Sequence, residues 1–461
     1  MIATHPYKHM LGIFTFLCTN LFYGQNVDIP GAPVMPTPVP ASLYVAPINS
    51  GSPSNNKQNT RVQSPATLDF GRQQQQQDIL NEVEQHERLR EQTMQDVRSD
   101  IEELRPTVQY ELPSLSKKPG TEYYRDAFDK MALIDTENYS VKDINFQIEN
   151  AYFANKLDKA EFDEVVRQTG IFLKAKMKEL KYDANSNLAK NYILFQFFSE
   201  KMVLKLTGKK HESLKYDFDD YMGAKDWSKM FVSKLIRTGT GQCRSMPMLY
   251  LILAEEIGAE AYLSLSPNHS YIKFQDEKKK WFNLELTNGM FTTNSFILNS
   301  GFIKAEAMQS QIYMQPLTKK QLLSQFYTDL AAGYYHKYGF DLFVEKAINK
   351  ALELYPKNIN ANMIKANYNT AKFENVMKQL KIHPTDKEQL QRIRNYPQAV
   401  ALLQETNGQY QAIDDLGFDF MPADAYEKWL GSLKKEEQKQ EGEKIDKQFK
   451  ALLVNKKGLD K

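Results

Sequence analysis

One stretch decides the fold: Gly239-Thr-Gly-Gln-Cys243-Arg-Ser-Met-Pro-Met-Leu-Tyr-Leu-Ile-Leu-Ala-Glu-Glu-Ile-Gly258. A glycine-rich turn leads into apolar residues at helical spacing, and this pattern predicts a helix with one buried face. That face consists of Met246, Leu249, Tyr250, Leu253 and Ile257. Pro247 lacks an N–H and belongs in the first turn, so the helix is expected to begin at Arg244 or Ser245. Gly258 is well placed as its C-terminal cap.

A thiol therefore lies at the mouth of the predicted helix. The unpaired N–H groups and the dipole of a helix N-terminus favour an anion, which lowers the pKa of a cysteine placed there. Cys243 is consequently a candidate nucleophile. A lone cysteine is more often an inert buried residue, so the interpretation depends on what the fold brings to it. Arg244, the next residue, could hold an acidic group of a substrate or simply sit exposed.

Two strands are predicted downstream, at residues 269–274 and 281–287, with a polar loop at residues 275–279 between them. A hairpin symmetric about Glu277 pairs residues whose numbers add to 554. His269 then lies opposite Glu285, with the two Cβ atoms about 5 Å apart. A register slip of two residues would put Asn283 there instead. Either side chain could orient an imidazole.

Together these residues predict a nucleophile, a base and an orienting group, the set that thiol acyl transfer requires. His269 would take the proton of Cys243 and later protonate the leaving amine. Glu285 would fix the histidine tautomer and stabilise the imidazolium. The backbone N–H of Cys243, at the helix start, could donate to the oxyanion.

The same residues resemble the transglutaminase-like cysteine superfamily. The resemblance consists of Gly-Gln-Cys243 entering a helix, His269 on a strand, and the strand Trp281-Phe-Asn-Leu-Glu285-Leu-Thr287. In that family an apolar helix follows the cysteine, and a Trp-x-x-x-Asp-Pro-Thr strand follows the histidine strand. The resemblance covers roughly residues 125–310. It implies an α+β, papain-like fold with a helical N-terminal part, and a triad of Cys243, His269 and the acidic position.

This chain departs from the family pattern at three points. Glu285 stands where aspartate is usual, Leu286 replaces the usual proline, and Ser-Tyr rather than Ala-Trp follows His269. Two hypotheses follow. The first is an enzyme, a peptidase, amidase or acyltransferase, that acts on amide bonds of proteins or peptides by hydrolysis or transfer. The second is a catalytically inactive protein that serves as an interaction scaffold.

Residues 120–316 are assigned to the transglutaminase-like domain and residues 317–424 to a helical region. In the helical region, Ala331, Tyr335, Ile348, Ala351 and Pro356 have spacings similar to those of a tetratricopeptide repeat. One and a half repeats need stacked neighbours, so a plain helical hairpin packed on the first domain is the alternative. Residues 425–461 are predicted to form a charged C-terminal helix that is solvated or binds a partner protein.

The N-terminal quarter predicts export. Residues 1–24 read as a signal peptide, because the apolar run at 10–23 is too short for a comfortable membrane span. A short anchor and a misassigned start are the alternatives. Cys18 falls in that run, so the mature chain keeps one thiol. The expected location is the periplasm or the extracellular space, with attachment to the cell envelope as a variant.

The next two segments carry little apolar surface. Residues 25–72 hold eight of the 19 prolines and are predicted to be a disordered linker. Residues 73–106 are predicted to be one charged amphipathic helix, ended by Pro106. That helix is either solvated or part of a coiled coil.

Composition limits the remaining function classes. A length of 461 residues indicates two or three structured units, and a net charge of only +2 argues against a dedicated nucleic-acid binder. Two cysteines cannot build a disulfide framework or a thiolate zinc site. The seven histidines are dispersed, and no phosphate-binding glycine motif occurs. We therefore expect no metal, no cofactor, no nucleic acid and no stable membrane span after processing. The expected partners are a protein or peptide substrate and a protein bound through the C-terminal helices.

Overall fold

The computed structural model describes residues 68–103, 107–298, 302–384, 386–432 and 447. The chain divides into two compact units, Pro30–Gln109 and a larger one that contains Tyr110–Lys461. The predicted signal peptide at 1–24 and the tail from 433 lie outside the described residues, apart from residue 447. Within the described part, no helix is long and apolar enough to cross a membrane.

In the smaller unit the described element is helix α2, Leu68–Glu103. The predicted helix is therefore confirmed over residues 73–103, although it begins inside the segment assigned to the linker, and its predicted end at Pro106 lies outside the described residues. Its side chains from residue 80 to residue 97 are all exposed, and Leu80, Val83, Met94 and Val97 are among them. The rest of the predicted linker lies outside the described residues.

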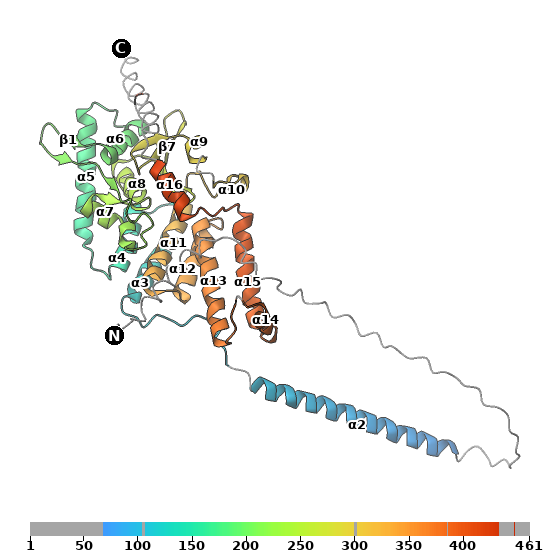
Figure 1. The fold of residues 1–461 in the computed structure, drawn as a ribbon. Helices are drawn as coiled ribbons and strands as arrows, with labels where there is room; N and C mark the ends of the chain where they lie inside the picture. Colours follow the sequence, from blue (N-terminus) through green and yellow to red (C-terminus); the bar gives the residue numbers. More distant parts are fainter. Residues whose placement is uncertain (1–67, 104–106, 299–301, 385, 433–446, 448–461) are drawn as a thin grey trace, which may run out of the picture. The chain divides into compact units, whose positions relative to one another are not determined.

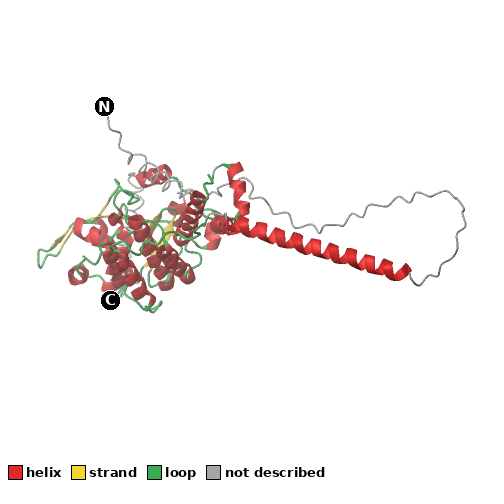
Figure 2. Cartoon of the chain, turned by 90° about the horizontal axis from the view of Figure 1, so that it is seen from below, coloured by secondary structure: helices red, strands yellow, loops and turns green. Residues whose placement is uncertain are grey.

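The larger unit is an α+β structure, mostly helical with small sheets (Figures 1 and 2). Its first part contains α3 (Thr121–Ala132), α4 (Val141–Tyr152), α5 (Lys159–Glu179), α6 (Asn187–Ser199) and α7 (Val232–Thr238). These confirm the helix-rich segment predicted before the cysteine. Two short pairings accompany them: β1 (Met202–Val203) with β2 (Lys210–His211), and β3 (Lys215–Tyr216) with β4 (Thr240–Gly241).

The core is built around helix α8, Ser245–Ile257. Nearly every α8 side chain is buried, including Met248, Leu251 and Ile252 outside the predicted face, because helices α4 to α7 and strands β5 and β6 all pack against it. Helices that are apolar all round belong in such interiors. Both predicted boundaries of α8 are confirmed, since Arg244 is the N-cap and Gly258 ends the helix with φ 71°.

One antiparallel sheet follows, with β5 (Tyr262–Ser266), β6 (His269–Gln275), β7 (Trp281–Glu285) and β8 (Met290–Thr292) in sequential order. The predicted register of β6 and β7 was wrong by two residues. Ile272 pairs with Leu284 and Gln275 with Trp281, so the residue numbers add to 556 rather than 554. The reason is the loop, which runs from 276 to 280 and not from 275 to 279.

After the short helices α9 (Asn294–Leu298) and α10 (Ala305–Ser310), the chain is helical again. Helices α11 (Lys319–Tyr338), α12 (Leu342–Leu354), α13 (Ile359–Gln379) and α15 (Pro397–Asp415) pack in sequence and lie side by side in Figure 1. Between the last two stand α14 (Lys387–Leu390) and a 3-10 turn, Gln391–Asn395. Helix α16, Ala423–Ser432, ends the described run.

Helix α11 belongs to both halves of the larger unit. Its residues 322–334 are buried without interruption, because α3 and α4 pack on it as well as α12 and α13. The Tyr124 ring of α3 meets the Tyr334 ring of α11 edge to face, with centroids 5.3 Å apart. The helical segment predicted after residue 317 is thus confirmed as helical and shares its core with the preceding part.

Candidate functional site

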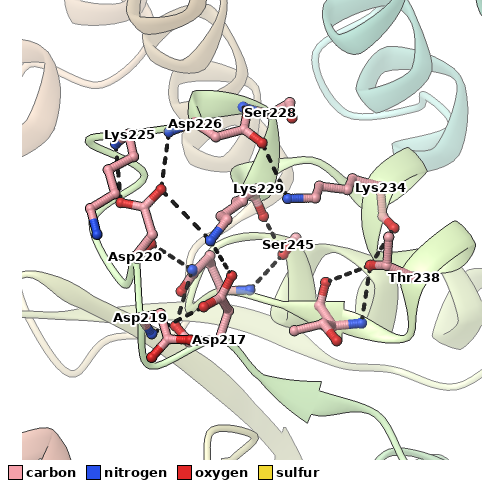
Figure 3. A network of polar contacts seen from close by, with 12 residues as sticks. Asp217, Asp219, Asp220, Lys225, Asp226, Ser228, Lys229, Lys234, Thr238 and Ser245 are labelled. Carbon is pink, nitrogen blue, oxygen red and sulfur yellow. Dashed lines mark hydrogen bonds and ion pairs between the residues drawn. The ribbon is translucent and has the colours of Figure 1, made fainter.

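A polar network fixes the turn before Cys243 (Figure 3). Lys229 forms an ion pair with Asp217 at 2.5 Å, and Asp220 accepts the N–H groups of Lys225 and Asp226 at 3.1 and 3.0 Å. These bonds hold residues 217–230 in a closed loop against the base of α8. Ser245 Oγ, the first α8 hydroxyl, donates to the carbonyl of Lys229 at 3.3 Å.

Gln242 connects that loop to the turn that carries Cys243. Its buried side chain donates to the carbonyl oxygens of Asp217 and Asp220 at 3.2 and 2.7 Å, and its N–H donates to Ser245 Oγ at 2.8 Å. Gly241 permits this approach, since a Cβ there would lie 2.8 Å from Ser245 Oγ. The glycine and glutamine before Cys243 therefore have a positioning role.

Cys243 lies just before α8 and is partly buried. The Ser270 hydroxyl of β6 donates to its carbonyl oxygen, and its Sγ is 3.9 Å from the carbonyl oxygen of Asn268. Strand β6 and the mouth of α8 are thus joined at the thiol. Burial raises the pKa of the Cys243 thiol, but hydrogen bonds and charge from His269, with two tyrosine hydroxyls, outweigh burial and lower it.

His269 and Glu285 meet as an almost fully buried pair. His269 Nε2 is 2.8 Å from Glu285 Oε2, and the side chains are 1% and 4% exposed. The other carboxylate oxygen accepts the N–H of Thr287 at 2.8 Å. Since Nε2 faces a carboxylate, it carries the proton, and Nδ1 is left to accept one.

The pKa values of this pair move apart. Burial favours the neutral imidazole, but the charge of Glu285 and the thiol together raise the pKa of His269. Burial opposes ionisation of Glu285 as well, and His269 and Thr287 outweigh it, so the pKa of that carboxyl is lowered. These directions favour a thiolate beside an imidazolium.

Asn283 does not lie opposite His269, which is the position considered from the sequence. Asn283 pairs with Lys273 across the sheet, and its Nδ2 donates to Asn294 Oδ1 at 2.8 Å. The observed register slip moves the strand away from an Asn283–His269 pairing. Glu285 reaches His269 diagonally, because its direct partner position is Tyr271 rather than His269.

Tyr426, on α16, is a site residue that the sequence did not reveal. Its hydroxyl is 3.1 Å from His269 Nδ1, its side chain is fully buried, and the ring of Trp429 lies 5.0 Å from the imidazole ring. Trp429 and Leu430 were visible as scattered apolar residues in a charged tail. Nothing in the pattern connects that tail to a histidine 157 residues earlier.

Tyr216 is a second tyrosine at the thiol. It lies on β3, whose partner strand β4 leads into the Cys243 turn, and its side chain is 7% exposed. The hydroxyls of Tyr216 and Tyr426 both contribute to the lowered pKa of Cys243. The thiol is therefore influenced by side chains from three separate segments of the chain, β3, β6 and α16.

Arg244 is partly buried, so the expectation that it sits exposed was wrong, whereas its binding of an acidic substrate group stays a prediction. Its guanidinium forms an ion pair with Asp329 of α11, and the side chains are 18% and 7% exposed. Gln325 donates to the second carboxylate oxygen of Asp329 at 3.0 Å, and Asn360 of α13 donates to Gln325 at 3.2 Å. A chain of polar contacts thus runs from α13 to Arg244, the residue after Cys243.

A cavity of about 240 Å³ borders the thiol. Its lining includes Cys243, Arg244 and His269, together with residues of α11 and α13. The helical segment after residue 317 is therefore part of the site. No cluster of His, Cys, Asp and Glu side chains suited to a metal ion occurs within the described ranges.

Comparison of the chain with protein-family models, with curated proteins and with solved structures finds no match.

Proposed function

We propose that this protein is an exported, thiol-dependent acyl-transfer enzyme of the transglutaminase-like type, acting on amide bonds of proteins or peptides. The single observation that carries the proposal is the state of His269. Glu285 holds its Nε2 at 2.8 Å, and the imidazole lowers the pKa of the Cys243 thiol. A nucleophile, a base and an orienting carboxylate therefore occur in the order that this chemistry needs.

The proposed reaction begins from the ion pair, in which the Cys243 thiol has given its proton to His269 Nδ1. The thiolate attacks the carbonyl carbon of an amide, and the Cys243 N–H at the helix mouth donates to the oxyanion. Collapse of this intermediate breaks the C–N bond, and Nδ1 returns the proton to the departing amine. Water or a second amine then attacks the thioester, which yields hydrolysis or transfer and restores the thiol.

The arrangement of elements supports the finer fold assignment. A buried helix stands behind the thiol, an antiparallel sheet carries the histidine and the carboxylate, and helices precede both. We infer a papain-like, transglutaminase-like core from this order. The packing of helices α11, α12 and α13 in sequence supports a tetratricopeptide-like region, and the outer surface of these helices is the proposed site for a partner protein.

Thiol labelling tests the proposal directly. In a Cys18→Ser chain, Cys243 is the sole thiol, and a small alkylating reagent such as iodoacetamide reports its thiolate fraction. His269→Ala should slow labelling near neutral pH by about tenfold or more, because the thiol loses the imidazolium that favours its ionised form. His383→Ala, an exposed histidine in the same unit, is the matched control and should leave the rate unchanged.

The same measurement separates the two hypotheses. One observation favours the scaffold hypothesis: Tyr426 and Trp429 of α16 pack on His269. If the wild-type thiol labels no faster than an unperturbed thiol and His269→Ala changes nothing, the enzyme proposal is overturned. A thioester adduct at Cys243, trapped by mass spectrometry with an activated peptide ester, would support acyl transfer.

A further inference from the structure

The cavity beside the thiol contains one cationic and one anionic side chain besides the thiol–imidazole pair. Of the described residues that line it, Arg244 is the sole lysine or arginine and Asp329 the sole carboxylate. An arginine next to a nucleophile would ordinarily select an acidic substrate group, since its planar fork binds carboxylates well. Here the carboxylate comes from the protein itself, because Asp329 is paired with that guanidinium.

Two hydrogen bonds in series hold Asp329 in this position. Gln325, one turn earlier on α11, donates to its free carboxylate oxygen at 3.0 Å. Asn360 of α13 donates in turn to the oxygen of Gln325 at 3.2 Å. Because Asp329 is 6% exposed, the ion pair is shielded from solvent and its charges largely cancel within the cavity.

The remaining walls are mostly apolar. The apolar lining includes Met248, Leu263, Leu265, Met363, Ile364 and Phe418. A pocket of this kind gains affinity by removing apolar surface from water. A charged side chain placed there would lose its hydration and find no unpaired countercharge.

We propose that this cavity is the subsite for the substrate side chain nearest the reacting carbonyl, that it takes an uncharged apolar side chain, and that Asp329 sets this preference by neutralising Arg244. The inference rests on the proposed function only in identifying the occupant of the cavity as part of a substrate. The preference itself is a property of the cavity and can be measured without turnover. Asp329 acts through Arg244 and is a specificity-determining residue rather than a catalytic one.

Methanethiosulfonates of similar size and different charge provide the test. Their propyl, sulfonatoethyl and aminoethyl forms transfer a neutral, an anionic and a cationic group to Cys243. In the full-length Cys18→Ser chain, we expect the propyl reagent to react fastest relative to its rate with a free thiol. Asp329→Asn should then raise the ratio of anionic to neutral labelling by about tenfold, because Arg244 loses its countercharge.

Two further variants keep the test decisive. Arg244→Gln leaves Asp329 unpaired, so the ratio of cationic to neutral labelling should rise, a shift of opposite sign. Asp341→Asn replaces another buried aspartate of the helical segment, 2% exposed and not a cavity residue, and should leave both ratios unchanged. Ratios that stay constant in Asp329→Asn and Arg244→Gln would overturn the inference, as would a wild-type preference for the anionic reagent.

The outcome is separable from that of the proposed function. If His269→Ala leaves the thiol as reactive as before but the charge ratios shift as expected, the cavity binds apolar groups and the acyl-transfer proposal alone fails. If His269→Ala slows labelling and the ratios do not respond to Asp329, the reaction proposal stands and the subsite inference fails.

Discussion

The carboxylate of Glu285 reaches His269 along a diagonal of the sheet. Direct cross-strand neighbours have Cβ atoms about 5 Å apart, and diagonal neighbours lie about 7–8 Å apart. Glutamate is one methylene longer than the aspartate of the family pattern, and that extra length spans the diagonal. The residue that departs from the pattern therefore fits the register that the strands adopt.

This geometry predicts how Glu285 can be changed. Glu285→Gln keeps the length but removes the charge that raises the pKa of His269, so the thiolate–imidazolium pair should weaken. We expect Cys243 labelling near neutral pH to slow by about tenfold, with its pH midpoint moved upward. Glu285→Asp keeps the charge but is too short for the diagonal, and it should also slow labelling. Stopped-flow labelling across a pH series measures both variants.

The direction of the pH dependence of Cys243 labelling follows from the pKa shifts of Cys243 and His269. A lowered thiol pKa beside a raised imidazole pKa means that wild-type labelling persists at pH values below the ordinary thiol pKa of 9.0. The labelling rate falls only at the lower pH at which the thiolate takes up a proton. A wild-type midpoint at the ordinary thiol value, or full activity of Glu285→Asp, would contradict this account of the pair.

At the scale of elements, the clearest connection is between α4 and α7. Glu149 of α4 accepts the N–H groups of Val232 and Ser233 at 2.6 and 2.8 Å, and the amide of Asn145 at 2.8 Å. Its carboxylate therefore satisfies the first N–H groups of α7, which a helix cannot satisfy by itself. Helix α7 in turn leads into the Cys243 turn.

Removal of the Glu149 carboxylate should destabilise the start of α7, the helix that precedes the Cys243 turn. Glu149→Ala leaves buried N–H groups without acceptors, which costs about 1–3 kcal/mol of unfolding free energy. Glu149→Gln retains an acceptor oxygen and should cost less. Urea unfolding followed by circular dichroism measures the difference, and equal stability of Glu149→Ala and the wild type would show that α7 needs no such support.

The pH dependence of the stability difference between the wild type and Glu149→Gln has a defined direction. Burial raises the pKa of Glu149 above its ordinary value of 4.5, although its hydrogen bonds oppose the shift. A carboxyl whose folded pKa is raised stabilises the native state most at low pH, and that contribution is lost as pH rises through the folded pKa. The difference in unfolding free energy between the wild type and Glu149→Gln should therefore narrow as pH rises. A difference that widens with pH would contradict the raised pKa of Glu149.

Sequence patterns were informative where the determinants are local. Pro247 and Gly258 located both ends of α8, because first-turn proline and terminal glycine act within a few residues of the boundary. The β6–β7 loop was placed one residue too early, which was enough to shift the register by two. Tyr426 and Asp329 were not found, since only the folded chain brings α16 and α11 to the thiol.

At the scale of the whole larger unit, α11 makes the two segments inseparable. Asp341, at the start of α12, accepts the N–H of Leu115 and the hydroxyl of Tyr334, both at 2.9 Å. With α11 buried on all sides through residues 322–334, neither segment has a complete core of its own. The boundary predicted at residue 317 therefore divides a shared core.

Calorimetry can test this shared core. The unit from Tyr110 onward should unfold in a single transition, and a fragment of residues 317–432 should show no cooperative unfolding, because α11 would lose the α3 and α4 side chains that cover it. Two separate transitions in the intact chain, or a cooperatively folded fragment, would show that the helical segment is autonomous.

The position of α16 in the chain sets the order in which the site can be made. A ribosome synthesises Cys243 and His269 long before Tyr426, which lies near the end of the described chain. The nascent protein therefore has its thiol and imidazole before the helix that packs on them exists. If the protein is exported unfolded, as proposed, assembly is postponed further, until helix α16 has docked on the imidazole.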